Sequence, residues 1–162
     1  MRGHFVHPSE AYHSFSMASK CRFHMQPIFV AYCTPLLTPA NAELLAVANP
    51  TVFCSVHHLD MRFIQIDKIG AYHLHASASQ LAGTSWYDLV HPYDIAEASF
   101  KHKMLCEEKE NSSLMLLRLQ TFRGDFIWLH CLLTLKDNSR NVDAAKRVIN
   151  AVCQIIRCAC AF

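Results

Sequence analysis

Hydrophobic and polar residues alternate along two short segments in the middle of the chain, at 51–58 and 61–67. The first segment reads TVFCSVHH and the second MRFIQID, and both are rich in β-branched and aromatic residues. Such runs favour β-strands, and only Leu59 and Asp60 separate the two. The pattern therefore predicts an antiparallel hairpin over 51–67.

Two longer hydrophobic runs follow at 113–121 and 126–137, joined by a turn around Gly124, and they predict a second hairpin. Because side chains alternate between the faces of a strand, the second run has two faces of different character. One face is almost uniformly aliphatic and we expect it to lie inward, whereas the other mixes aromatic, polar and aliphatic residues. The first face carries Ile127, Leu129, Cys131, Leu133 and Leu135, and the second carries Trp128, His130, Leu132 and Thr134.

Helical signals fill the interval between the two hairpins. Ser77 and Gln80 have capping-box spacing, and Gly83 is well placed to end that short helix. Pro92 suits the first turn of a longer helix, where Asp94 is also favourable. One face of the longer helix shows helical periodicity, which indicates packing against a sheet. Its members are Ile95, Ala98, Ser99, His102, Leu105 and Cys106.

The two ends of the chain are less regular. Residues 27–33, PIFVAYC, predict a short buried strand. Residues 41–50 are small and are bracketed by prolines, which favours a linker. The centre of the tail, 148–156, suits one more strand or equally a helix. The order of these elements predicts an α+β fold with an antiparallel sheet of about five strands, covered on one face by short helices and one longer helix.

Composition limits the classes of function. The 162 residues carry a net charge of +2, which is too small to favour nucleic acid or an anionic membrane as a partner of this region. No uninterrupted apolar run is long enough to predict a membrane span. The sequence has no nucleophile elbow, phosphate-binding glycine loop or zinc-protease motif, so we expect no enzyme, no catalytic residues and no cofactor.

Eight cysteines and eleven histidines raise the question of disulfides and metals. Cysteines such as Cys54 and Cys131 lie within apolar runs, where a free thiol behaves as a small hydrophobic group, so a reducing compartment is expected. Cys21 and His24 have ligand-like spacing, as do some other pairs, but none has a second half-site at a zinc-finger distance. We therefore expect no metal site.

Four segments together resemble a PAS domain, and more narrowly the second PAS repeat (PAS-B) of bHLH-PAS transcription factors. They read LDMRFIQID, SASQLAG, SWYDLVHPYDIAEASFKHKMLCE and RLQTFRGDFIWLHCLLTLKDN. The run from Ser85 and the last hairpin are most similar to the neuronal PAS-domain and dysfusion branch. The resemblance covers about residues 51–138, and the tail after Asn138 matches the family less well.

The resemblance implies a division into regions. Residues 1–40 resemble the C-terminal strands of a preceding PAS-A repeat, 41–50 would be the linker, and 51–157 would form a PAS-B domain with a divergent C-terminal tail. The family's basic helix-loop-helix does not match any part of the chain, so we expect a fragment or a divergent gene product. DNA contact would belong to that absent region.

The resemblance also implies a function in RNA polymerase II transcription, in the nucleus, through heterodimerisation with a class II bHLH-PAS protein. That partner would be of the aryl hydrocarbon receptor nuclear translocator or Tango type, with no membrane partner. The last hairpin supplies the candidate partner interface, because exposed apolar groups on one sheet face usually mark an interface. Its expected members are Arg118, Gln120, Trp128, His130 and Leu132.

The alternative function is a small-molecule sensor with a ligand in an internal cavity. His102 and His130 are its candidate cavity-lining residues, although a histidine on an apolar face is more often a hydrogen-bonded core residue. Trp86 and Leu89 precede the longer helix. They would cover such a cavity as a lid, or they would pack the core. We expect both residues to be buried.

Overall fold

The structure is a computed structural model of the chain, and it describes residues 2–6, 28–32, 35–138 and 146–156. The chain divides into two compact units, residues 1–35 and 36–162. In the first unit, β1 (Arg2–Val6) and β2 (Ile28–Tyr32) form an antiparallel two-stranded sheet. The strand predicted over 27–33 is therefore present.

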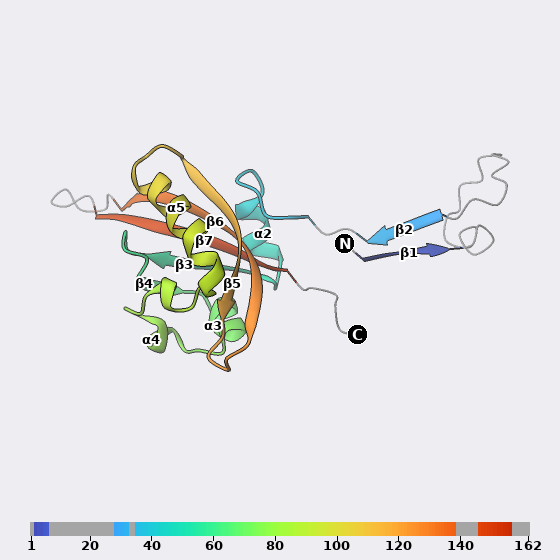
Figure 1. The fold of residues 1–162 in the computed structure, drawn as a ribbon, viewed down its shortest axis with the longest axis horizontal. Coiled ribbons are helices and arrows are strands. Elements are labelled where there is room, and N and C mark those ends of the chain that lie inside the picture. The colour runs from blue at the N-terminus through green and yellow to red at the C-terminus, as the bar shows by residue number, and fades with distance from the viewer. Residues whose placement is uncertain (1, 7–27, 33–34, 139–145, 157–162) are drawn as a thin grey trace. The chain divides into compact units, whose positions relative to one another are not determined.

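The second unit is built on a five-stranded antiparallel sheet with the strand order β4-β3-β7-β6-β5 (Figure 1). Both predicted hairpins are confirmed, as β3 with β4 and as β5 with β6. The strands are β3 (Val52–His57), β4 (Phe63–Ile66), β5 (Ser112–Gln120), β6 (Phe126–Asn138) and β7 (Lys146–Ile156).

The tail, whose pattern suited a strand or a helix, forms β7 at the centre of the sheet, between β3 and β6. Ile149 and Ala151 face the main core, and Val152 packs on the opposite face. A strand buried on both faces has no clean alternation of polar and apolar residues, so periodicity could not distinguish it from a helix.

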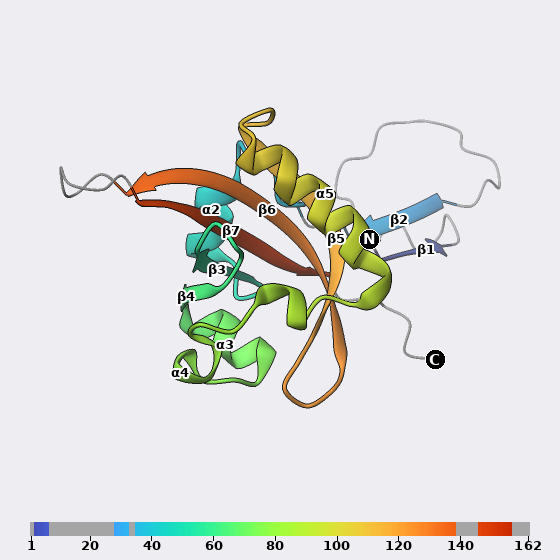
Figure 2. The same ribbon diagram turned by 60° about the vertical axis from the view of Figure 1, so that its left-hand side comes forward.

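Several helical elements cover one face of the sheet, and α2 (Ala42–Ala48) lies against the other (Figures 1 and 2). On α4 the capping box of Ser77 and Gln80 is confirmed, and Gly83 follows with a φ of 79°. No helix in the described segments is long and apolar enough to cross a membrane. The helical elements of the first face are α3 (Lys68–Leu74), α4 (Ala78–Leu81), the 3-10 turns η1 (Trp86–Asp88) and η2 (Pro92–Asp94), and α5 (Ile95–Cys106).

The longer helix begins later than Pro92 suggests. Pro92 opens the 3-10 turn η2, and α5 starts at Ile95. Ala98 and Leu105 of the predicted face are buried, but Ile95 and Ser99 are exposed. The buried stripe of α5 is therefore narrower than predicted. Its two buried residues, Ala98 and Leu105, lie seven residues apart and so share one line along the helix.

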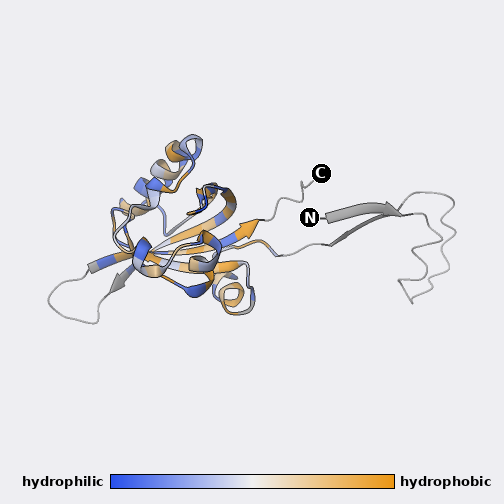
Figure 3. Ribbon diagram, turned by 90° about the horizontal axis from the view of Figure 1, so that it is seen from below, coloured by the Kyte–Doolittle hydropathy of each residue, from blue (hydrophilic) through white to orange (hydrophobic). Residues whose placement is uncertain are grey.

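The main core lies between the sheet and the covering helices. It contains Trp86 and the inward residues Leu129, Cys131 and Leu133 of β6, with Ile127 and Leu135 at its margin. The prediction that the aliphatic face of β6 points inward is confirmed. Trp86 is fully buried as expected, whereas Leu89 is only partly buried. Figure 3 shows hydrophobic residues concentrated along the strands of this sheet.

The interval expected to be a linker contains α2. Leu37 and Ala42 pack with Leu132 in a second small cluster on the outer face, supported by Leu45 and Val152. The small residues and flanking prolines of this segment hide its helical pattern, so the sequence predicts a linker where the structure has a helix. The outer face is therefore partly covered by this chain's own residues.

The free edge of β5 is protected by the segment that precedes α5. Gln120 N–H donates to Leu89 O (2.7 Å), and His91 N–H donates to Arg118 O (2.9 Å). Further along, Lys101 Nζ donates to Leu114 O at 2.6 Å. Edge strands with satisfied backbone groups resist uncontrolled pairing with other chains. These contacts thus close the part of the β5 edge nearest to Arg118 and Gln120.

We expect Gly70→Ala to destabilise the second unit. An added Cβ would lie 2.7 Å from Ile66 Cδ1 and from Phe53 Cδ2. Overpacking of this kind costs about 1–3 kcal/mol, which outweighs the roughly 1 kcal/mol that alanine gains over glycine in a helix. Urea denaturation measures the change, with Ala71→Gly as the control for helix propensity. A Gly70→Ala protein more stable than wild type would show that this contact relaxes without cost.

Candidate interaction surface

The outer face of the sheet has a covered part and an open part. Leu132 is only 3% exposed because it lies beneath α2, so its predicted place in an exposed interface is corrected. The open part lies on β5 and β6, where strand register sets Arg118 opposite Trp128 and Gln120 opposite Phe126. We call this set the open patch. It consists of Leu116, Arg118, Gln120, Phe126 and Trp128.

The open patch exposes large apolar side chains on a regular strand surface. Leu116 is 50% exposed, Phe126 42% and Trp128 38%. Phe126 and Trp128 share a face because they lie two residues apart on β6, and Leu116 joins them because it pairs with His130 of the same face. A clustered apolar surface on a folded unit typically marks a site of protein contact. Leu116 and Phe126 were not predicted, although the alternation that selected Arg118 and Trp128 places them on the same face.

The Trp128 ring contacts Arg118, and Arg118 in turn is paired with Asp94. Arg118 Cζ lies 4.9 Å from the centroid of the Trp128 ring. The Arg118 guanidinium in turn donates from Nε (2.9 Å) and Nη2 (2.7 Å) to the Asp94 carboxylate, and Arg118 N–H donates to Asp94 Oδ2 at 2.9 Å. The hydrogen bonds from Arg118 lower the pKa of Asp94, so this carboxylate stays ionised.

The other two predicted interface residues lie at the margin of the open patch. Gln120 Nε2 donates to Gly124 O (3.3 Å), which ties this side chain to its own hairpin turn. His130 is partly buried, and its Nδ1 has no hydrogen-bond partner among the described residues. Burial, and then the positive charge of Lys101, lower the pKa of His130. His130 is thus mainly neutral at physiological pH.

The two histidines predicted to line one cavity are not brought together. His102 lies on α5, over the inner face, whereas His130 shares the outer face with Leu132. His102 Nδ1 accepts from the Tyr87 hydroxyl (2.7 Å), and its Nε2 donates to Leu59 O (2.9 Å). Both ring nitrogens are therefore satisfied within the fold, as for a structural histidine.

His57 is a buried polar residue that was not selected from the sequence as a cavity residue. It is fully buried on β3, where Ser55 Oγ lies 2.8 Å from His57 Nε2 and the Phe63 ring centroid lies 4.5 Å from the imidazole. Burial lowers the pKa of His57 to about 4, and the nearby His102 and His58 act in the same direction. Alternation from Phe53 would have placed Ser55 and His57 on the inner face.

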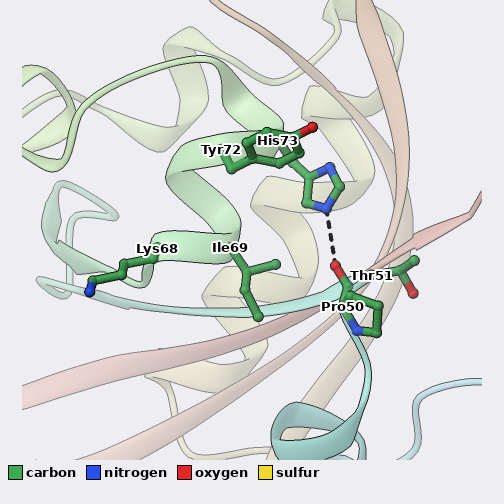
Figure 4. Close-up of a pocket in the computed structure, with 6 residues that line it drawn as sticks. All are labelled: Pro50, Thr51, Lys68, Ile69, Tyr72 and His73. Carbon is green, nitrogen blue, oxygen red and sulfur yellow. Dashed lines mark hydrogen bonds between the residues drawn. The ribbon is translucent and has the colours of Figure 1, made fainter.

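A shallow surface pocket lies where α3 meets the start of β3 (Figure 4). Its volume is about 360 Å³, and Ile69 and Tyr72 contribute to its apolar lining. His73 Nε2 donates to Pro50 O at 3.1 Å across the pocket, which links α3 to the chain before β3. Neither His102 nor His130 lines this pocket.

The cysteines of the described segments are free thiols, namely Cys54, Cys106, Cys131 and Cys153. Cys131 and Cys153 face each other across β6 and β7 with their sulfurs 2.8 Å apart. The Cys131 contact and burial raise the pKa of Cys153, which keeps this thiol protonated. No group of three or more metal-ligating side chains occurs within the described part of the chain, and Cys21 and His24 lie outside it.

Comparisons with known proteins agree with this architecture. The PAS domain family model matches residues 51–158. The PAS domain-containing protein cky-1 of Caenorhabditis elegans is 38% identical over 151 residues, which are 93% of this chain and 22% of that protein. A neuronal PAS domain-containing protein 4-like protein of Danio rerio is 32% identical over 98 residues, 60% of this chain and 15% of that protein.

Two further comparisons extend the set. The basic helix-loop-helix ARNT-like protein 1 of Tyto alba is 28% identical over 91 residues, covering 56% of this chain and 14% of that protein. The solved PAS-B structure of Drosophila melanogaster Cycle, with bound ethylene glycol, aligns with a TM-score of 0.56 and 23% identity, over 64% of this chain and 99% of that one. This chain spans about a fifth or less of the full-length relatives.

Proposed function

This chain belongs to the PAS domain family, as a PAS-B region of the bHLH-PAS type, and on that premise we propose that its second unit is a heterodimerisation module. The observation that carries the proposal is the open patch on β5 and β6. The segment before α5 is hydrogen-bonded to part of the free edge of β5, and α2 covers the neighbouring part of the face. The open patch is thus an exposed apolar part of this sheet that a partner can reach.

The chemistry of the open patch suits protein contact. It combines a tryptophan, an arginine, a phenylalanine and a leucine with a glutamine. Aromatic residues and arginine are enriched among the residues that dominate binding energy at protein interfaces. The buried histidine and protonated thiols of the core offer no activated nucleophile, and we infer a regulatory rather than a catalytic role.

We propose further that the partner is a class II bHLH-PAS protein of the aryl hydrocarbon receptor nuclear translocator or Tango type. The role would then be transcription regulation in the nucleus, with DNA contacted by a basic helix-loop-helix outside this chain. The relationship to bHLH-PAS proteins supports this, since one relative is itself ARNT-like. The modest net charge of +2 is consistent with a region that contacts protein rather than DNA.

We expect Trp128→Ala to weaken heterodimer formation while leaving the fold intact. Truncation of a central aromatic anchor typically costs about 2 kcal/mol or more, which is roughly a thirtyfold increase in Kd. Isothermal titration with the PAS-B domain of the translocator-type partner measures Kd, and circular dichroism checks the fold. Tyr72→Ala is the matched control, because Tyr72 is an exposed aromatic residue on the helix-covered side.

Two outcomes would contradict this proposal. Equal Kd values for Trp128→Ala and wild type would show that the open patch is not the heterodimer surface. Equal losses for Trp128→Ala and Tyr72→Ala would show a non-specific effect of removing exposed aromatic groups.

The small-molecule sensor is the second candidate, and the polar groups buried within the fold favour it. Ser113 Oγ is buried in the same unit as His57 and has no hydrogen-bond partner among the described residues. Buried polar groups normally bond to protein, water or ligand. Native mass spectrometry of the purified protein discriminates the two functions. A stoichiometric co-purifying ligand would favour the sensor, and its loss in His57→Phe would place the ligand at this histidine.

A further inference from the structure

Trp128 lies on an otherwise open surface, yet its ring is contacted by a side chain that is itself fixed. The Arg118 guanidinium lies over the ring at 4.9 Å from the centroid. An arginine side chain without a partner samples many rotamers at a surface, so it would contact the Trp128 ring only part of the time. What distinguishes Arg118 is its partner on η2, Asp94.

Asp94 holds Arg118 through three hydrogen bonds. Oδ2 accepts from the Arg118 backbone N–H and from Nε, and Oδ1 accepts from Nη2. Planar, two-pronged arginine–carboxylate contacts fix orientation as well as position. The pair is largely shielded, with 25% of the Arg118 side chain and 16% of the Asp94 side chain exposed. By contrast, the Asp60–Arg62 pair is more than half exposed on both sides.

We propose that Asp94 and Arg118 are positioning residues that preset the Trp128 ring for the partner. This inference rests on the proposed heterodimer function of the open patch. Ordering a side chain during association costs binding free energy, and a ring ordered in advance avoids that cost. Asp94 fixes the plane of the Arg118 guanidinium through Nε and Nη2, and this fixed plane lies over the Trp128 ring, so Arg118 acts on Trp128.

The assignment also specifies the surface that the partner presents. Trp128, Phe126 and Leu116 are the groups offered for contact, and the arginine charge beside them is paired with Asp94. We expect the counter-surface to be apolar opposite Trp128. Any acidic group on it would reach only the Nη1 donors of Arg118, because Asp94 already holds Nε and Nη2.

The test compares Asp94→Asn and Arg118→Lys with Asp60→Asn, a matched control at the exposed ion pair. The chain has two tryptophans, so protein labelled with 5-fluorotryptophan gives one ¹⁹F signal for buried Trp86 and one for Trp128. We expect both test variants to shift or broaden the Trp128 signal and leave the Trp86 signal unchanged. Kd for the translocator-type PAS-B domain should rise about threefold to tenfold. Asp60→Asn should change neither.

Arg118→Lys keeps the positive charge but loses the planar fork, so it separates orientation from net charge. The inference is overturned if Asp94→Asn and Arg118→Lys fold normally, retain the Trp128 signal and bind as wild type, while Trp128→Ala still weakens binding. It is also overturned if Asp94→Asn only lowers Tm and leaves both signals and Kd unchanged. Wild-type binding by Trp128→Ala would instead refute the proposed function, and with it this inference.

Discussion

Trp86→Ala should destabilise the second unit by about 3–5 kcal/mol, the range typical of a large aromatic residue removed from a core. Trp86 is 1% exposed, and its ring packs edge-on against Tyr87 with centroids 5.4 Å apart. Its backbone N–H also donates to Met61 O at 2.9 Å, which fixes η1 beside β4. Urea denaturation followed by far-ultraviolet circular dichroism measures the change.

Trp128→Ala provides the internal comparison, because it removes the same side chain from the surface. The Trp128→Ala variant lacks the cation–π contact with Arg118, which contributes about 0.5–1 kcal/mol to stability at an exposed site. Trp128 is 38% exposed and Trp86 is 1% exposed, so we expect Trp128→Ala to destabilise the unit less than Trp86→Ala. Equal destabilisation by the two variants would mean that Trp86 and Trp128 do not differ in burial as described.

Acid should destabilise the fold through His57, with the loss beginning near pH 6.5. Burial holds the pKa of His57 at about 4 in the folded chain, below the ordinary value of 6.5. Above pH 6.5 the imidazole is neutral in both states, so stability is unaffected. Between pH 6.5 and about 4 the unfolded chain binds a proton that the folded chain does not. Stability falls by about 3 kcal/mol over this window.

The pKa values of His102 and His130 are also lowered by burial, so both add to the loss in the same direction. Chemical denaturation at a series of pH values gives the slope, and His57→Gln should flatten it by up to one proton. The adjacent His58→Gln is the control and should leave most of the slope in place. A wild-type slope in His57→Gln would show that His57 does not carry the effect.

The sequence predicted the architecture well where alternation was clean. The aliphatic residues from Ile127 to Leu135 selected the inner face of β6, and the structure places them in or beside the main core. The capping box at Ser77 was likewise readable, because it depends on local spacing alone. The resemblance to a PAS-B domain rested on these same segments.

Features set by tertiary contacts were harder to predict. The covering of Leu132 by α2 depends on contacts between segments more than 80 residues apart, which no local pattern records. The prediction that His102 and His130 line one cavity is wrong, because the two residues lie on opposite sides of the sheet. Each histidine lies on an apolar face in the sequence, but the pattern alone does not tell which side of the sheet that face meets. Arg118 was selected from the strand pattern, but its bond to Asp94 required the path of η2 along the edge of β5.

Hydroxyl-radical footprinting of the heterodimer with the translocator-type PAS-B domain shows whether the partner binds at the open patch. The exposed residues Leu116, Phe126 and Trp128 report on the open patch, and Tyr72 and Phe100 report on the helix-covered side. We expect Leu116, Phe126 and Trp128 to lose reactivity on binding, and Tyr72 and Phe100 to keep theirs. Protection of Tyr72 and Phe100 with unchanged Trp128 would contradict this expectation.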